Sequence, residues 1–582
     1  MLILKKYQTH IVLLFLMIAG FWLRFHLACV KNVATDEIAT LVTASQMFPK
    51  GIIYALVTKN FHAPLYYILL HFWMLLFGDS TMSLRMMPVL FGTLCIPAAY
   101  ACGKELVSKF AGFSVAILVT VNAFMINYSY FGKFYALLEL LGFLSIYFII
   151  RISKNPLKKY FVCLACINAC IIYTYVTGFV FVGIQFLIFA GYDFIVQKKQ
   201  NWRRWLGYAV GVILLTGPVI PMMWMTIRNT QSAIAPGFWW YEYEKEHILT
   251  VIMTWFSPAV PIGFTGTNTE IIQRFKGHLG WSVLWNVLPT LLASAVVYVT
   301  VRKKKILDLL LLTTCGFLLC EWIAALAGRF AFIPRHTLLV FPALILCIGA
   351  GVALFEKRVF AYAVLNTFLF VNMGYLYAFS NMDIPVPPNK VLTLARHLEN
   401  LQLDKGDKVI LPMRGYLLTY FYHPKDVDIL SFDLNYTLKT GDRQIISKLY
   451  SAQDIDTEQT TVHGKFRRYI DSQQPTEAIS NYLRQHILID LREGNRVILV
   501  DNCENKPKPK LKPKSKPRFV IVVEDNQANG KMSDGMFFNA LCEKVSADVK
   551  AVLKQNKFQI TEFIPDSNIS VYRPIQGEYL QQ

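Results

Sequence analysis

Long apolar runs are the feature that most constrains this chain. Runs of about 17 to 22 residues recur up to residue 380, and each is long enough to cross a bilayer as a helix. Of all residues, 54% are hydrophobic and only 16% are charged, whereas about a quarter of the residues in a soluble globular domain are charged. The sequence therefore predicts a polytopic α-helical membrane protein.

Basic clusters between the apolar runs predict the topology. Lys and Arg stay cytoplasmic in short loops, so we place inside the cell the clusters at 104–109, 151–159, 198–204, 302–305 and 356–358. Lys5 and Lys6 precede the first run without a cleavage site after it, which is typical of a signal anchor with a cytoplasmic N-terminus. Threading between the clusters gives about eleven spans, near 10–29, 86–103, 110–127, 134–150, 160–176, 178–196, 205–226, 281–301, 306–327, 337–355 and 359–379.

One apolar segment, Leu65–Phe77, is too short for an ordinary span. If it crossed the bilayer, the basic loops after it would lie outside the cytoplasm, contrary to the preference of Lys and Arg for the cytoplasmic side. We therefore expect it to form a helix in or against the outer leaflet.

The composition changes after Ser380, which the odd number of spans places outside the cytoplasm. We divide the chain into a transmembrane module (1–380), a Pro-rich linker (381–390) and a soluble α/β domain (391–582), because short strand-like runs alternate with helical stretches in the last part. The net charge of +20 lies mostly in the basic loops and in one Lys-Pro run. We therefore predict contact with membrane lipid but not with nucleic acid.

The loop at 30–85, the first on the outer side, collects polar residues beside the membrane. Asp36 and Glu37 follow the first predicted span, His62 precedes the short helix, and Arg85 precedes the next span. Acids, histidine and arginine are costly beside a bilayer, so a group of them at its edge is a functional-site hypothesis.

These residues fall within motifs that occur in order along the chain. The motifs are Asp36-Glu37, the His-Ala-Pro-Leu-Tyr-Tyr run at 62–67, Phe77-Gly78, the Ser-Leu-Arg run at 83–85, the segment 128–137, and Arg335-His336 with Pro342. Together they resemble the bacterial protein-O-mannosyltransferase-like glycosyltransferases, to which the aminoarabinose transferases of lipid A are related. That family uses polyprenyl-phosphate sugars and has the membrane fold called GT-C. The resemblance extends from residue 10 to residue 355.

The chain departs from the family pattern at three places. Lys133 stands where the family usually has arginine, Ala63 replaces one of two prolines, and the run at 174–176 is Thr-Tyr-Val instead of Thr-His-Tyr. Lysine keeps the charge but lacks the two-pronged hydrogen bonding of arginine. The sugar donor of any one relative is therefore not transferred to this chain.

The resemblance implies transfer of a sugar from a polyprenyl-phosphate donor to an acceptor hydroxyl outside the cytoplasm. Such a reaction needs a general base for the hydroxyl, for which we choose Asp36, with Glu37 orienting the acceptor or a neighbouring cation. It also needs fixed cations for the departing phosphate, and the candidates are Lys133, Arg85 and Arg335. One displacement with one base predicts inversion at the anomeric carbon.

The remaining substrate-binding candidates are His62, Tyr66, Tyr135 and His336. His62 could bind phosphate, acceptor or a metal, or could make a structural hydrogen bond to the Asp36 loop. We assign no metal ligands and leave a divalent metal open. The acceptor is a glycan, a lipid or a protein. The resemblance to bacterial proteins places the chain in the cytoplasmic membrane, with the C-terminal domain in the periplasm.

Two other functions fit some of these residues. A transporter or flippase for lipid-linked glycans would use the same acids and cations as a binding cavity, but the chain shows neither an internal repeat nor paired Gly/Pro-broken segments. A glycan polymerase or ligase would depend on arginines and a histidine in late outer loops. Asp36 is the residue that distinguishes a transferase from a polymerase or ligase.

Overall fold

The computed structural model describes residues 2–31, 35–57, 62–198, 201–233, 288–303, 305–326, 334–381, 390–404, 407–411, 428–431, 438–440, 443–445, 496–500, 534–564 and 569–574. The chain divides into two compact units. The first comprises 1–231 and 240–386, and the second comprises 232–239 and 387–582. Each unit is considered by itself below.

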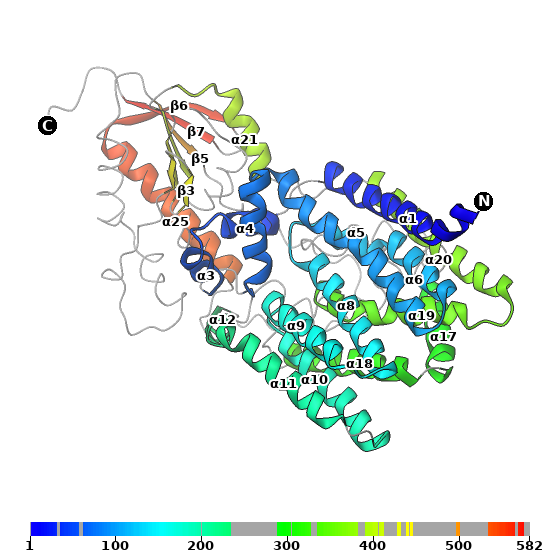
Figure 1. Cartoon of the computed structure of the whole chain (residues 1–582). Coiled ribbons are helices and arrows are strands. Elements are labelled where there is room, and N and C mark those ends of the chain that lie inside the picture. Colours follow the sequence, from blue (N-terminus) through cyan, green and yellow to red (C-terminus); the bar gives the residue numbers. More distant parts are fainter. Residues whose placement is uncertain are drawn as a thin grey trace, which may run out of the picture. The chain divides into compact units, whose positions relative to one another are not determined.

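The first unit is helical (Figure 1). Its elements are α1 (Leu2–Val30), α2 (Thr35–Ala44), α3 (Lys50–Ala55), α4 (Leu65–Phe77), α5 (Thr81–Leu106), α6 (Lys109–Val121), α7 (Ala123–Ser129), α8 (Tyr135–Lys154), α9 (Lys158–Thr174), α10 (Gly178–Gly191), the π-helix η2 (Tyr192–Val196), α11 (Trp202–Thr216), the 3-10 helix η3 (Gly217–Val219), α12 (Ile220–Ala233), α17 (Leu288–Lys303), α18 (Lys305–Leu326), the 3-10 helix η5 (Pro334–Leu339), α19 (Phe341–Ala353) and α20 (Arg358–Asn381).

A helix overlaps each of the predicted spans, but fewer helices qualify as spans by length and composition. Among the described residues there are six: Tyr7–Val30, Thr81–Leu106, Tyr135–Lys154, Gly178–Val196, Trp202–Thr226 and Lys305–Ala324. The pair α6 and α7, bent by 58°, would make a seventh. The protein is therefore a multi-pass membrane protein, whereas the expected number of about eleven spans stays a prediction. The segment Leu65–Phe77 forms a short apolar helix, α4, as predicted.

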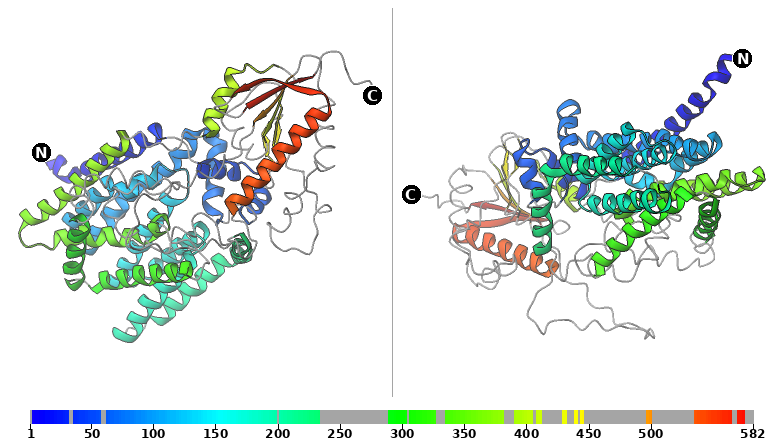
Figure 2. Two further views of the ribbon diagram at one scale, coloured as in Figure 1. Left: turned by 180° about the vertical axis from the view of Figure 1, so that it is seen from behind. Right: turned by 60° about the horizontal axis from the view of Figure 1, so that its bottom comes forward.

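Close contact between α5 and α6 is made possible by small residues. A Cβ atom on Gly103 would lie 2.8 Å from the carbonyl oxygen of Ala111, and one on Gly112 would lie 2.8 Å from that of Tyr100. Helices in a membrane gain stability from packing this close, because the lipid tails are as apolar as their own side chains. Figure 2 shows α5 and α6 side by side within the helical unit.

The break between α6 and α7 is stabilised by two asparagines. Asn122 accepts a hydrogen bond from the Met125 N–H at 2.9 Å, and Asn372 of α20 accepts one from the Ala123 N–H at 2.9 Å. Backbone groups freed inside a membrane must find partners, so these amides make the bend possible. The short α7 then leads into the turn at 130–134, which carries Lys133.

The second unit contains a five-stranded sheet in the order β2-β1-β5-β7-β6. Its strands are β1 (Lys408–Leu411), β2 (Asp428–Ser431), β5 (Val497–Val500), β6 (Phe558–Ile564) and β7 (Ile569–Pro574). The β1–β2 and β1–β5 pairs are parallel, and the β5–β7 and β6–β7 pairs are antiparallel. The helix α25 (Asp534–Gln555) packs against β6 and lies along the sheet (Figure 2).

The other described elements of this unit are the helix α21 (Lys390–Asn400) and a two-stranded antiparallel pair, β3 (Leu438–Thr440) and β4 (Arg443–Ile445). Most of the predicted linker, 382–389, lies outside the described residues. The division into linker and soluble domain stays a prediction.

Candidate active site

The two acidic residues of the first loop lie in the first turn of α2 and point to different partners. Consecutive residues of an α-helix are about 100° apart around its axis. The side chains of Asp36 and Glu37 therefore project in different directions. The side chain of Asp36 is 41% exposed, whereas that of Glu37 is fully buried.

Glu37 forms a buried ion pair with Arg85. Arg85 Nε donates to Glu37 Oε1 at 2.8 Å, and Nη2 donates to Oε2 at 2.7 Å. The other terminal nitrogen of Arg85 donates to the carbonyl oxygens of Ala28 and Lys31 at 2.8 and 2.6 Å. Glu37 Oε1 also accepts a hydrogen bond from the Gly132 N–H at 2.8 Å. This pair therefore joins the end of α1, the start of α2, the start of α5 and the turn at 130–134.

The start of α5 is fixed locally, which positions Arg85. Ser80 caps the helix by accepting a hydrogen bond from the Ser83 N–H at 3.1 Å, as serine commonly does at this position. The indole of Trp73 on α4 donates to the Ser83 carbonyl oxygen at 2.9 Å. Arg85 follows in the first turns and is only 1% exposed.

Two predicted roles concern this pair. Arg85 was expected to bind the donor phosphate, and Glu37 was expected to orient the acceptor or a neighbouring cation. The structure buries both side chains and joins Arg85 to Glu37 and to two carbonyl groups. The two roles stay predictions.

Asp36 lies between two cations. Its Oδ2 is 3.5 Å from Lys133 Nζ and 3.6 Å from Arg335 Nη1. Burial alone would raise the pKa of Asp36, but the charges of Lys133 and then Arg335 outweigh it and lower the pKa to about 2. Burial lowers the pKa of Lys133, and the charge of Asp36 opposes this shift. The structure therefore brings together three of the predicted site residues, which are more than 90 positions apart along the chain.

An aromatic group lies beside this acid–cation cluster. The His62 ring stacks on Tyr67 with centroids 6.0 Å apart and meets Phe134 edge-on at 5.3 Å. Tyr175 lies 5.9 Å from Phe134 and 6.0 Å from His336, measured between ring centroids. Both predicted histidines therefore border the cluster.

His62 is held in its neutral form. Burial, and then the positive charge of Lys133, lower its pKa well below the ordinary 6.5. A neutral imidazole can donate one hydrogen bond and accept another. His62 can therefore contact a hydroxyl or a phosphate oxygen without adding charge to the site.

The two predicted tyrosines differ in position. Tyr135 begins α8 and is an electrostatic neighbour of both Asp36 and Arg335. Tyr66 is fully buried and neighbours Glu37 instead. The next residue, Tyr67, neighbours Asp36 and Tyr135.

Sequence reasoning did not assign three residues that the structure places at the site: Gly132, Tyr67 and Tyr175. A Cβ atom on Gly132 would lie 2.6 Å from Leu84 Cγ, so the absence of a side chain lets this turn lie close to α5. Gly132, Tyr67 and Tyr175 all lie in motifs already noted, and those motifs were the available signal.

Within the described residues, no group of three or more His, Cys, Asp and Glu side chains could hold a metal ion. His62 and Asp36 are electrostatic neighbours, but the nearest charges around them are positive. The residues present are thus arranged for an anion.

Part of this region matches the model of a known family. Residues 61–224 match the family described as "Dolichyl-phosphate-mannose-protein mannosyltransferase". The predicted family resemblance is confirmed. The matched segment contains His62, Arg85, Lys133 and Tyr135, whereas Asp36 and Arg335 lie outside it. The match supports glycosyl transfer at a membrane.

Two solved structures are also similar to this chain. ArnT from Cupriavidus metallidurans, bound to undecaprenyl phosphate, is 13% identical over 73% of this chain and 86% of its own, with a TM-score of 0.47. The oligosaccharyltransferase AglB from Archaeoglobus fulgidus, in complex with an inhibitory peptide and a dolichol-phosphate, is 11% identical over 99% of this chain and 75% of its own, also with a TM-score of 0.47. No curated protein sequence matches the chain.

Proposed function

We propose that the protein is a membrane glycosyltransferase that moves a sugar from a polyprenyl-phosphate donor to an acceptor hydroxyl. The observation that carries this proposal is the position of Asp36 between Lys133 and Arg335. A partly exposed carboxylate is available to a substrate, and the two cations beside it can bind a phosphate. The reaction needs both a general base for the acceptor hydroxyl and cations for the departing phosphate.

The charge of the cluster matches the donor. One carboxylate faces two cations, and His62 is neutral, so the cluster has an excess of one positive charge. A sugar linked to a lipid through one phosphate carries about one negative charge where it is bound. Hydrogen bonds from charged donors to such a phosphate are short and strong, especially where water is scarce.

Donor binding would also activate the base. Without donor, Asp36 pairs with the cations, and its low pKa makes it a weak proton acceptor. When the phosphate takes over Lys133 and Arg335, Asp36 loses part of this stabilisation and its pKa rises. Asp36 then accepts the proton of the acceptor hydroxyl as that oxygen attacks the anomeric carbon and the bond to the phosphate breaks.

Other residues would shape the site around this step. His62, Tyr135 and His336 offer hydrogen-bonding groups to the sugar or the acceptor. Tyr67 and Tyr175 add aromatic surface next to the two histidines. The Glu37–Arg85 pair positions Asp36 without touching substrate. A single displacement inverts the anomeric centre, and transfer takes place outside the cytoplasm, with the C-terminal domain on that side in a bacterial cytoplasmic membrane.

The first test is transfer by purified full-length protein in detergent, with a panel of polyprenyl-phosphate sugars and crude membrane acceptors. Asp36→Asn should reduce the transfer rate by about 10²- to 10⁴-fold, the usual contribution of a general base. It should bind undecaprenyl phosphate at least as tightly as the wild type, since it no longer competes for the cations. Asp79→Asn, an exposed acid between α4 and α5, is the control and should transfer normally.

One result would reject the choice of base, and another would reject the transferase itself. Full transfer activity in Asp36→Asn would show that this carboxylate is not the base. Donor binding by the wild type without transfer to any acceptor, together with movement of the donor across liposomes, would favour a carrier. Retention at the anomeric carbon, read from the coupling constant of the product, would reject the single-displacement mechanism alone.

A further inference from the structure

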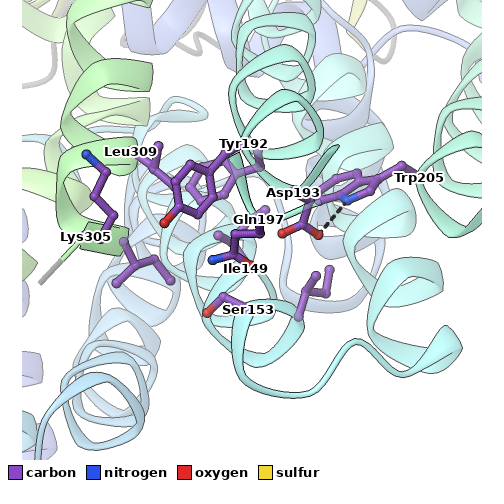
Figure 3. Close-up of a pocket in the computed structure, with 11 residues that line it drawn as sticks. Ile149, Ser153, Tyr192, Asp193, Gln197, Trp205, Lys305 and Leu309 are labelled. Carbon is purple, nitrogen blue, oxygen red and sulfur yellow. Dashed lines mark hydrogen bonds between the residues drawn. The ribbon is translucent and has the colours of Figure 1, made fainter. Parts of the chain in front are cut away.

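A second site lies at the other end of the helical unit. A cavity of about 180 Å³ is lined by residues of α8, α10, η2, α11 and α18. Figure 3 shows Lys305 and Leu309 on one side of it and Asp193 and Trp205 on the other, with Tyr192 and Gln197 between them. It lies wholly within the described residues and has no part in the reaction proposed above.

The helix α8 fixes the distance of this cavity from Asp36. Tyr135, at the start of α8, borders the acid–cation cluster, and Ser153, near its end, lines the cavity. At 1.5 Å per residue, the intervening helix is about 27 Å long, close to the ~30 Å thickness of the hydrocarbon core of a bilayer. Because α8 has the length and composition of a membrane span, we infer that the cavity lies at the level of the lipid headgroups on the face opposite Asp36.

The π-helix η2 builds one wall. The Gln197 N–H donates to the Tyr192 carbonyl oxygen at 3.0 Å, closing the wider turn that is typical of π-helices and frequent at functional sites. This turn brings Tyr192, Asp193 and Gln197 to the same wall of the cavity.

Asp193 is held in a fixed orientation. Its Oδ2 accepts hydrogen bonds from the Trp205 indole at 3.1 Å and from the Asn201 amide at 3.4 Å. In Figure 3 the other carboxylate oxygen faces away from Trp205. A carboxylate beside the rings of Tyr192 and Trp205 suits an ammonium group, which both a carboxylate and an aromatic face attract.

Lys305 supplies the opposite charge. Its side chain is 63% exposed, and its ammonium lies 3.2 Å from Asp308 Oδ2. Exposed pairs of this kind are weak, so the ammonium can exchange that partner for a phosphate. The remaining wall is apolar, with Ile149, Phe189 and Leu309 among its residues.

We propose that this cavity binds the headgroup of an aminophospholipid, with the ammonium at Asp193 and the phosphate at Lys305. The volume fits such a group, since pockets for larger organic ligands occupy about 300 to 1,000 Å³. The apolar wall accommodates the first carbons of the lipid. The site would anchor a lipid on the face of the membrane opposite Asp36.

The test is native mass spectrometry of the full-length protein in detergent with equal amounts of phosphatidylethanolamine and phosphatidylglycerol. The wild type should retain phosphatidylethanolamine in preference to phosphatidylglycerol. Asp193→Asn, which keeps an oxygen for the Trp205 indole, should reduce the retained phosphatidylethanolamine by about tenfold, as expected for loss of one charged hydrogen bond. Glu105→Gln is the control, because Glu105 pairs with Arg151 and Lys154 at this same end of α8 but does not line the cavity.

A second variant keeps the test valid if Asp193→Asn is unstable in a thermal melt. Lys305→Ala removes an exposed side chain and should weaken retention of both lipids, because both carry a phosphate. Equal retention of phosphatidylethanolamine by the wild type and Asp193→Asn would overturn the proposal. Preference of the wild type for phosphatidylglycerol would also overturn it, since that result indicates a basic surface without an ammonium site.

Discussion

Arg85 and Glu37 are 48 positions apart and form a two-bond ion pair at 2.8 and 2.7 Å, with both side chains buried. The pair sits beside the acid–cation cluster but is separate from it. Because the pair also makes hydrogen bonds to backbone groups of Ala28, Lys31 and Gly132, it fixes the loop from which Asp36 projects.

Removing one member of this pair should destabilise the protein. Glu37→Gln leaves the Arg85 guanidinium buried without its counter-charge, a loss of about 3–5 kcal/mol in comparable buried pairs. The measurement is the thermal melt in detergent. Asp308→Asn is the control, since its partly exposed pair with Lys305 contributes about 0–1 kcal/mol. Similar melting temperatures for both variants would contradict this assignment.

Glycine at position 132 should be required for the fold of the site. Gly132→Ala puts a Cβ atom 2.6 Å from Leu84 Cγ and strains the turn that donates to Glu37. We expect lower stability and lower transfer activity. Gly183→Ala on α10 is the control: nothing lies within 4 Å of its Cβ position, so alanine should be neutral or stabilise that helix by up to about 1 kcal/mol.

The two cations should affect donor binding more than folding. Lys133→Met and Arg335→Met should each raise the KM for the lipid-phosphate donor by at least about tenfold, the usual range for a charged hydrogen bond. Lys133→Arg should retain most of the affinity, because the charge is kept. Lys158→Met, at the start of α9, should leave KM unchanged. Unchanged KM and kcat in both methionine variants would argue against phosphate binding by these residues.

The pH dependence should differ between free and donor-bound enzyme. In the free enzyme, the pKa of Asp36 is about 2, so kcat/KM should show no acid limb from Asp36 between pH 4 and pH 9. If donor phosphate draws the cations away, the pKa rises in the complex and kcat should fall toward the acid end of this range. Coincident acid limbs in the two profiles would count against activation of the base by donor.

His62 should make stability depend on pH near neutrality. Its folded-state pKa is lowered below 6.5, so below that pH the unfolded chain binds the extra proton first and stability falls as pH falls. The melting temperature of the wild type should therefore drop between pH 7 and pH 5. His62→Gln, which cannot take up this proton, should show a smaller drop over the same interval.

Much of the site was predictable because the relevant chemistry is local in sequence. Asp36, His62 and Lys133 each stand in a short motif beside an apolar segment, and their residue types are costly there without a role. The aromatic residues around the acid–cation cluster were harder to predict. Residues 66 and 67 are both tyrosine, and the sequence does not tell which of them faces the site. Only the orientation of α4 places Tyr67 beside His62.

The sequence by itself determined that the chain crosses a membrane several times, that a short apolar helix follows the first loop, and which motifs carry the family resemblance. Those properties depend on the lengths of apolar runs and on charge placement, which are readable residue by residue. Tertiary structure alone decided the pairing of charges. Asp36 and Glu37 are neighbours in sequence, yet the ~100° turn per helical residue directs one to Lys133 and Arg335 and the other to Arg85.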